Sequence, residues 1–422
     1  MKRPANIHRT MAYVASFAVG RGSLFGAPIL LANLLPAVDY GHVETAQAAA
    51  SLASGLVTLG TAGVIPLLLL RHVQTSSLRA IVTFHLVVAA ACCIVAVAAR
   101  IGGMDVAWQL AALFTAATTL QTLGSTHLRT QGRSDASVIL DAGMFVLMAL
   151  AATIAWFDRS AIPLAWVAGA VLVYAATLFM LYLRIRRTAP SGGRGLDMFR
   201  GALSLGVPIV LGNSVSALAT TSGRLGMGLL AGPLVTADYA ALARACALPI
   251  IAHQLCVIAS YRKLFELDER QVEQIAARIL WLVAAGVVAF MIATPWTGRF
   301  LGHAFDSAYA RFRLPAMWIL AQAVLWSGTA LNDLVAARKG VMARMLPASM
   351  GYMTLALAIG FTVLSQIGPT LNHFVRVHAL LLFLFYLVQS TAMRLNGIKM
   401  WRVWLTGAGT YLSLLAIAQL FF

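Results

Sequence analysis

The chain has 422 residues, of which 60% are hydrophobic and only 11% are charged, and its mean hydropathy is +0.83. Because no soluble fold has an interior for this much apolar surface, the composition predicts a polytopic α-helical membrane protein. The apolar segments are continuous rather than alternating, which excludes an outer-membrane barrel. A net charge of +17 would favour nucleic-acid binding in a soluble protein, but here the loops account for it, so we expect no nucleic-acid partner.

Thirteen membrane spans are predicted from hydropathy over a window of about 20 residues. The N-terminus lacks a short apolar region that ends at a small-residue cleavage site, so we expect the first span to remain uncleaved. In chain order the spans cover residues 10–35, 43–70, 78–99, 105–127, 136–157, 161–183, 202–231, 236–261, 276–296, 312–337, 344–366, 372–393 and 401–421.

The basic residues orient these spans. With the N-terminus in the cytoplasm, the cytoplasmic loops and the N-terminal segment hold 22 of the 31 Lys and Arg, whereas the opposite loops hold five. The positive-inside rule therefore predicts a cytoplasmic N-terminus. The remaining four basic residues lie within spans, at Arg21, Arg224, Arg244 and Arg376.

Two polar segments interrupt the apolar pattern. Residues 184–200 are rich in Arg, Gly, Ser and Pro, which is typical of a flexible cytoplasmic linker. Residues 262–278 mix charges with apolar residues at helical spacing and predict an interfacial helix on the cytoplasmic face. The first segment follows the sixth span and so divides the chain into halves.

The two halves resemble each other. An Asp-Tyr pair precedes a small-residue helix in each half, at Asp39-Tyr40 and at Asp238-Tyr239. The fourth span of each half ends in a basic turn with one glycine, in 107–133 and in 317–340. Six plus six spans of the same orientation predict parallel repeats that suit alternating access. The alternative is chance similarity between Ala- and Leu-rich segments.

This repeat predicts four parts of the chain. They are an N-lobe of six spans, a cytoplasmic linker, a C-lobe of six spans and one additional C-terminal span. Their predicted boundaries are 1–183, 184–200, 201–393 and 394–422.

Three segments, 20–60, 202–250 and 300–340, carry a resemblance to a known superfamily. In these segments and in span order the chain resembles the MOP superfamily, specifically bacterial polysaccharide flippases of the O-antigen and exopolysaccharide type. It is more distantly similar to lipid II flippases and MATE transporters. The chain departs from the pattern in length, since members usually run longer and have twelve or fourteen spans.

The resemblance implies a V-shaped, all-α fold with two six-helix lobes around a central cavity, in the bacterial inner membrane. It implies a flippase that moves an undecaprenyl-pyrophosphate-linked oligosaccharide from the cytoplasmic to the periplasmic leaflet. Membrane lipids, a polysaccharide polymerase and a chain-length regulator would be its partners. An odd thirteenth span would place the C-terminus in the periplasm.

Three embedded arginines and one asparagine are predicted to bind the substrate. A charged side chain at bilayer depth persists only beside a partner or a wet cavity, and arginine pairs bidentately with phosphate. Arg21 lies roughly 16 Å along the first span, near mid-bilayer, whereas Arg224 and Arg244 lie roughly 10–12 Å below the outer surface. Asn213 is expected to face the cavity. The alternative is that each arginine bonds a helix carbonyl or snorkels.

Ion coupling is predicted at two aspartates, Asp141 in the fifth span and Asp333 in the tenth. Both lie near cytoplasmic helix ends, so the alternative is a purely structural role such as a favourable charge at a helix N-terminus. Three histidines within spans, at positions 85, 253 and 378, are weaker candidates, because a lone histidine is more often packed and hydrogen-bonded than part of a relay.

Other function classes are less well supported. The four cysteines lie in apolar spans without metal-ligand spacing, so we expect no metal and no cofactor. A multidrug or cation antiporter of the same superfamily would need acidic residues in its cavity. A polysaccharide polymerase or glycosyltransferase would need a large outer loop, whereas the longest here, 297–311, has about 15 residues. We therefore expect a carrier rather than an enzyme.

Overall fold

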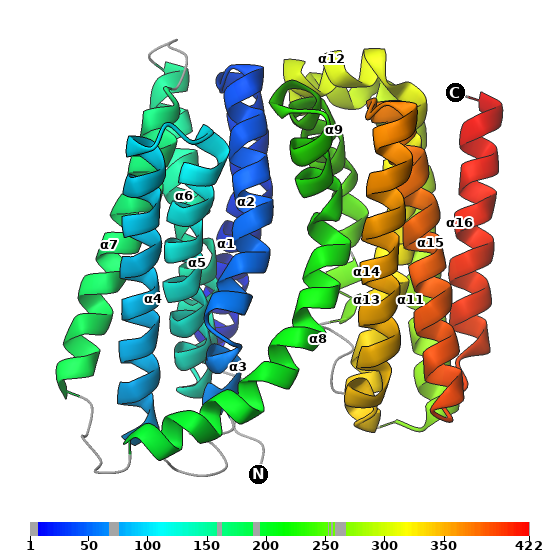
Figure 1. The fold of residues 1–422 in the computed structure, drawn as a ribbon. Helices are drawn as coiled ribbons and strands as arrows, with labels where there is room; N and C mark the ends of the chain where they lie inside the picture. The colour runs from blue at the N-terminus through cyan, green and yellow to red at the C-terminus, as the bar shows by residue number, and fades with distance from the viewer. Residues whose placement is uncertain are drawn as a thin grey trace. The chain divides into compact units, whose positions relative to one another are not determined.

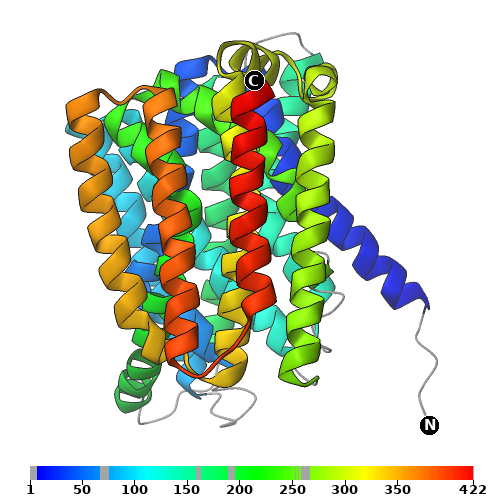
Figure 2. The ribbon, with the colours of Figure 1, turned by 90° about the vertical axis from the view of Figure 1, so that its right-hand side faces the viewer.

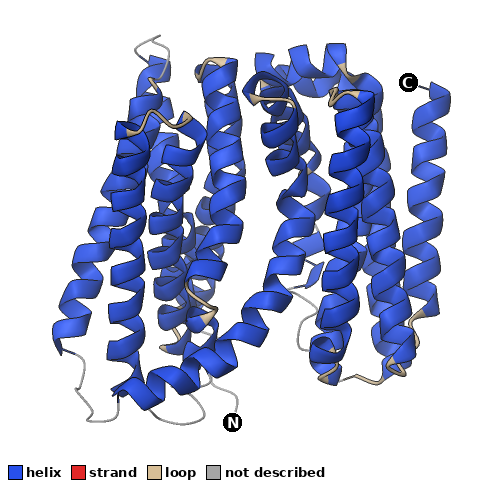
Figure 3. Cartoon of the chain, viewed as in Figure 1, coloured by secondary structure: helices blue, strands red, loops and turns tan. Residues whose placement is uncertain are grey.

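The structure, a computed structural model, describes residues 7–66, 76–157, 163–188, 195–251, 253–254, 256–257 and 267–421. Within these ranges every regular element is a helix and no strand occurs (Figure 3). This confirms the all-α prediction. The chain divides into two compact units, Met1–Ser214 and Val215–Phe422.

Unit 1 (Met1–Ser214) holds seven described helices and the first part of an eighth (Figure 1). They are α1 (Ile7–Leu34), α2 (Ala37–Val57), α3 (Thr61–Pro66), α4 (Ser76–Ile101), α5 (Val106–Thr130), α6 (Ser134–Phe157), α7 (Leu164–Thr188) and α8 (Gly195–Leu230).

Unit 2 (Val215–Phe422) holds the end of α8 and the helices that follow it. They are α9 (Pro233–Cys246), α11 (Glu269–Leu301), α12 (His303–Arg311), α13 (Arg313–Lys339), α14 (Met342–Ile367), α15 (Leu371–Leu395) and α16 (Trp401–Phe421). Figure 2 shows α16 between α11 and α15.

Nine helices in the described part are long and apolar enough to cross a membrane. They are the membrane-length parts of α1, α4, α6, α7, α11, α13, α14, α15 and α16. Of the other predicted spans, α2 and α5 have 21 and 25 residues but carry many polar side chains. Both are largely buried against other helices, so they do not need a lipid-facing apolar surface. The chain is a multi-pass membrane protein.

One helix occupies the centre of each unit. In unit 1, α5 packs against α2, α4, α6 and α7, and in unit 2, α13 packs against α9, α11, α14, α15 and α16. Each is the fourth predicted span of its half. Apart from α16, the neighbours of α13 correspond in chain order to those of α5. In the most apolar stretch of α13, 78% of the residues are buried, whereas in each of the other eight candidate spans the share is 44% or less.

Glycines let helices approach closely, as Gly328 in unit 2 and Gly206 in unit 1 illustrate. In unit 2 the ring of Tyr386 lies on the backbone of Gly328, where an added Cβ would be 2.7 Å from Tyr386 Cε2. The Tyr386 hydroxyl donates to the Val403 carbonyl at 3.0 Å and so joins α13, α15 and α16. In unit 1 an added Cβ on Gly206 of α8 would lie 2.5 Å from the Leu59 carbonyl oxygen. A larger residue at either glycine would separate the helices.

Two segments predicted as separate elements belong largely to longer helices in the structure. Of the predicted linker 184–200, residues 184–188 end α7 and 195–200 begin α8, while 189–194 lie outside the described residues. The predicted interfacial helix is not separate over 269–278, because these residues form the first turns of α11. Asp268 accepts a bond from the Gln271 amide at 2.8 Å and so caps that helix at its start.

Candidate functional site

Arg21 lies in the middle of α1 and is half-buried. Its guanidinium carbon is 5.6 Å from the centre of the Phe17 ring, a cation–π contact. Among the described residues no carboxylate lies within 4 Å of it. Arg21 is therefore a membrane-embedded cation whose guanidinium is not neutralised within the described part of unit 1.

The neighbour of Arg21 fixes its level in unit 1. A Cβ on Gly20 would lie 2.8 Å from Val138 Cγ1 and 3.5 Å from Ala142 Cβ. These α6 residues are about 6 and 12 Å from the start of that helix, whose 24 residues span about 36 Å. Arg21 thus lies at a level about a quarter of the way along α6 from its start. The basic loops predict that this end of α6 is cytoplasmic.

Arg224 and Arg244 are half-buried in unit 2. Arg224 is six residues before the end of α8, next to Gly223, on whose backbone the buried Tyr239 side chain packs. Arg244 lies in the last turn of α9, where its charge complements the helix C-terminus. That end was not expected, because the sequence predicted one span over 236–261.

Asn213 lies within α8, but its side chain falls outside the described residues. The substrate-binding prediction therefore divides between the units, with Arg21 in unit 1 and Arg224 and Arg244 in unit 2. Within unit 2 the two arginines come from consecutive helices, α8 and α9.

Asp141 is held in an ion pair. Its carboxylate pairs with Arg129 at the end of α5, and Arg129 Nε also donates to Ser137 Oγ at 2.9 Å. Gln121 Nε2 donates to the backbone carbonyl of Asp141 at 2.5 Å. These contacts tie α5 to α6 near the end predicted to be cytoplasmic.

Asp333 belongs to a set of polar side chains that we call the α13–α15 polar network: Asn332, Asp333, Gln389, Ser390 and Trp404. Gln389 Nε2 donates to Asp333 Oδ1 at 2.6 Å, and Asn332 Nδ2 donates to Gln389 Oε1 at 3.1 Å. Trp404 Nε1 donates to Asn332 Oδ1 at 3.3 Å. Asn332 and Gln389 are buried, at 0% and 2% exposed. The sequence signal was the Asn-Asp pair within an apolar span, together with the glutamine in the twelfth.

A buried carboxylate that the sequence reasoning missed lies in unit 1. Glu44 is only 1% exposed, and its Oε1 accepts a bond from the Tyr40 hydroxyl at 3.0 Å. Tyr40 and Glu44 are four residues apart and so lie on one face of α2. The repeated Asp-Tyr pair lies next to this position in the sequence, but the start of α2 was predicted to be an outer turn.

The described histidines differ in their contacts. Both ring nitrogens of the buried His85 have partners, Thr61 Oγ1 at 3.0 Å and the Thr119 carbonyl at 3.3 Å, so it is a packed residue. His378 Nε2 lies 2.9 Å from Ser222 Oγ, and its ring stacks on Phe374. His253 is buried, and its Nδ1 has no partner among the described residues.

The N-terminal parts of α2 and α9 are fixed in a similar way. His42 Nδ1 on α2 lies 3.4 Å from Asp105 Oδ1, just before α5. Asp238 on α9 accepts a charged bond from Arg311 of α12 at 2.7 Å. Each contact joins the second predicted span of a half to the connection before the central helix of its unit.

In the described residues no group of three or more His, Cys, Asp or Glu side chains is placed to hold a metal ion. The charged and polar side chains within the helices can bind an anion or a small cation, and they can hold a proton. That chemistry suits a carrier.

Comparison with solved structures bears on the fold. A protein described as "Inward-facing conformation of a multidrug resistance MATE family transporter of the MOP superfamily" aligns with 92% of this chain and 98% of its own, with a TM-score of 0.61 and 14% identity. The chain has the fold of a MOP-superfamily transporter. No protein-family model and no curated protein sequence matches it.

This match confirms the predicted fold class. At 14% identity it concerns the fold alone, so neither the substrate of that MATE transporter nor the polysaccharide-flippase subtype follows from it. The residues that this fold places inside the membrane bear on the substrate class.

Proposed function

We propose that the chain is a flippase that moves an undecaprenyl-pyrophosphate-linked oligosaccharide from the cytoplasmic to the periplasmic leaflet of the bacterial inner membrane. The observation that carries the proposal is Arg21, half-buried within a membrane helix and without a carboxylate within 4 Å among the described residues. An embedded cation of this kind persists only beside a partner or a water-filled cavity, and there it can bind a negative charge. A pyrophosphate supplies that charge.

Arginine is suited to this task. Its planar guanidinium forms two parallel bonds to phosphate oxygens and stays charged at every relevant pH. Arg21 lies near the cytoplasmic quarter of α6, where a lipid pyrophosphate enters from the inner leaflet. Arg224 and Arg244, on the helices of unit 2 nearer the predicted outer surface, serve the outward-open state. Alternating access between two repeats then carries the headgroup across.

The transport cycle needs a driving ion, and three carboxylates are candidates for binding it. Asp333 is held by Gln389 in the α13–α15 polar network, and Glu44 is buried beside Tyr40. Asp141 carries an ion pair to Arg129, so its protonation would release the contact between α5 and α6. We propose Glu44 and Asp333 as the ion or proton sites, with Asp141 in a secondary role.

Partners and orientation belong to the same proposal. We place the N-terminus in the cytoplasm and expect a polysaccharide polymerase and a chain-length regulator to receive the exported unit. A multidrug antiporter is the alternative, because the structurally similar protein is described as a multidrug transporter. The cationic side chains of α1, α8 and α9 favour an anionic substrate over a cationic drug.

The test is Arg21→Ala in a cell whose surface polysaccharide depends on this chain. We expect surface polysaccharide to be lost while the protein remains in the inner membrane at its normal level, and Arg21→Lys to restore only part of the export. Arg100→Ala, at the exposed end of α4, is the matched control and should export normally. Normal export by the Arg21→Ala variant would refute the pyrophosphate site. Drug resistance on overexpression without any polysaccharide defect would support the multidrug alternative.

A further inference from the structure

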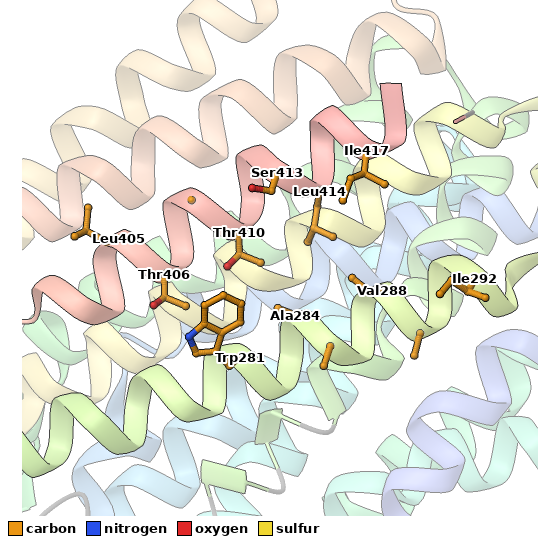
Figure 4. A pocket seen from close by; sticks show the side chains of 13 residues that line it. Trp281, Ala284, Val288, Ile292, Leu405, Thr406, Thr410, Ser413, Leu414 and Ile417 are labelled. Atoms are coloured by element: carbon orange, nitrogen blue, oxygen red, sulfur yellow. The ribbon is translucent and has the colours of Figure 1, made fainter. Parts of the chain in front are cut away.

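A long apolar groove lies within unit 2 between α11 and α16 (Figure 4). Its volume is about 630 Å³. Trp281 and Ile292 of α11 and Leu405 and Ile417 of α16 border it, and Figure 4 shows that the two helices run parallel there. The groove exists because the facing residues between these borders are small, with Ala284, Ala285, Ala289 and Gly409 among them.

The length of the groove matches one leaflet of a membrane. From Trp281 to Ile292 the helix rises about 16 Å, and half of a hydrocarbon core of about 30 Å is about 15 Å. The bordering side chains Trp281, Ile292 and Leu405 are 60%, 65% and 69% exposed, so the groove is open at its side. At this depth the surroundings are hydrocarbon, and an extended acyl chain is the molecule that fills such a groove.

Cationic side chains continue the two groove faces beyond one end. Arg278 precedes Trp281 by one turn of α11, and Arg402 precedes Leu405 by one turn of α16. Residues three or four apart lie on one face of a helix, so both arginines lie on the faces that line the groove. Both are exposed, as is Lys399 just before α16. The groove therefore has an apolar body and a basic end.

The basic end is also organised for a headgroup region. The Glu273 carboxylate accepts the backbone amide of Arg402 at 2.7 Å, which ties the start of α16 to α11 and occupies one carboxylate oxygen. Arg394 stacks on Trp401 with 4.7 Å between its guanidinium carbon and the ring centre. Tryptophan and arginine side chains of this kind concentrate at the level of lipid headgroups.

We infer that this groove binds an anionic phospholipid, with its phosphate at Arg278 and Arg402 and one acyl chain between α11 and α16. The charge of the basic end selects an anionic headgroup over a zwitterionic one. The small residues along the groove select an extended chain. This inference is independent of the transported substrate, because it concerns residues that the proposed flippase site does not use.

The test measures lipid binding to the full-length purified protein by native mass spectrometry. Phosphatidylglycerol, phosphatidylcholine and undecaprenyl phosphate are the three probes. We expect phosphatidylglycerol to bind roughly tenfold more tightly than phosphatidylcholine. The double variant R278Q/R402Q should lose that preference, and Gly409→Leu should weaken both phospholipids by filling the groove.

The control R299Q removes a basic residue from the outer end of the same helix α11 and should bind like the wild type. Helical content and elution volume check that each variant folds, and the arginine variant decides the matter if the leucine variant does not fold. Equal binding of the two phospholipids to the wild type, or an unchanged preference in R278Q/R402Q, overturns the inference. Displacement of phosphatidylglycerol by an equal amount of undecaprenyl phosphate also overturns it, since the groove would then serve the transported lipid.

Discussion

Replacing Gln389 by Leu tests whether the α13–α15 polar network stabilises unit 2. The glutamine makes three hydrogen bonds, to Asp333 Oδ1 at 2.6 Å, to the Thr329 carbonyl at 3.4 Å and from Asn332 at 3.1 Å. Hydrogen bonds between membrane helices contribute about 0.6 kcal/mol each on average. Three of them give a loss of about 2 kcal/mol, and leucine fills a similar volume without restoring any bond.

The expected shift in apparent melting temperature is about 4–8 °C downward for a unit of this size. A thiol-reactive fluorescent dye measures it in a protein whose partly exposed Cys92, Cys93 and Cys256 are replaced by serine, because the remaining Cys246 is 2% exposed and reacts only when unit 2 opens. Gln366→Leu, at an exposed position of α14 in the same unit, is the matched control. It should stay within about 0.5 kcal/mol of the wild type.

A Gln389→Leu protein that melts at the wild-type temperature, or above it, would refute this reasoning. It would mean that Asp333 finds equivalent partners without the glutamine. A melting-temperature shift equal to that of Gln366→Leu would also contradict a stabilising role of the network. The loss of stability would then come from an amide-to-leucine change at any position.

Three further predictions concern charged side chains. Glu44→Gln should remove ion-driven transport while leaving helicity unchanged, measured as polysaccharide export against protein level; export at the wild-type rate would contradict a coupling role. Arg129→Ala and Asp141→Ala should each impair export. The double variant Arg129→Asp/Asp141→Arg, which exchanges the two charges, should recover more than half of the export. No recovery of export would show that the two residues act separately. Arg311→Ala should lower the free energy of unfolding by about 1 kcal/mol or less, since Arg311 is exposed and its partner Asp238 is only partly buried. A double-mutant cycle with Asp238→Asn measures the coupling energy between the two residues, and a value near zero would mean that the pair adds no stability.

The fold class was readable from the sequence because apolar length is the main requirement for a membrane span. The predicted boundaries of α6 and α14 lie close to the observed ones, since lipid-facing helices carry apolar residues on all sides. The end of α9 at Cys246 was missed. No apolar signal marks it, because the residues on both sides of the break are apolar.

The candidate residues were predicted less well than the fold, because depth and partners depend on packing. Asp141 has the expected position on α6 but turned out to be paired with Arg129, twelve residues earlier. Glu44 was missed because an acidic residue near an apparent turn looks solvated, whereas α2 begins at Ala37 and already buries Glu44 in its second turn.

The proposed ion sites lie on helices with limited lipid contact. The helices α2 and α5 are long but are not among the nine apolar spans, and α13 is among the least apolar of the nine. Helices that face other helices are free of the requirement for an apolar surface, so their polar side chains can be used for binding. Glu44 on α2 and Asp333 on α13 belong to this group. The helices with a weak membrane signal therefore hold the proposed ion sites, whereas the proposed anion-binding residues Arg21 and Arg224 lie on the apolar helices α1 and α8. The helices α11 and α16 border the groove proposed to bind a lipid chain.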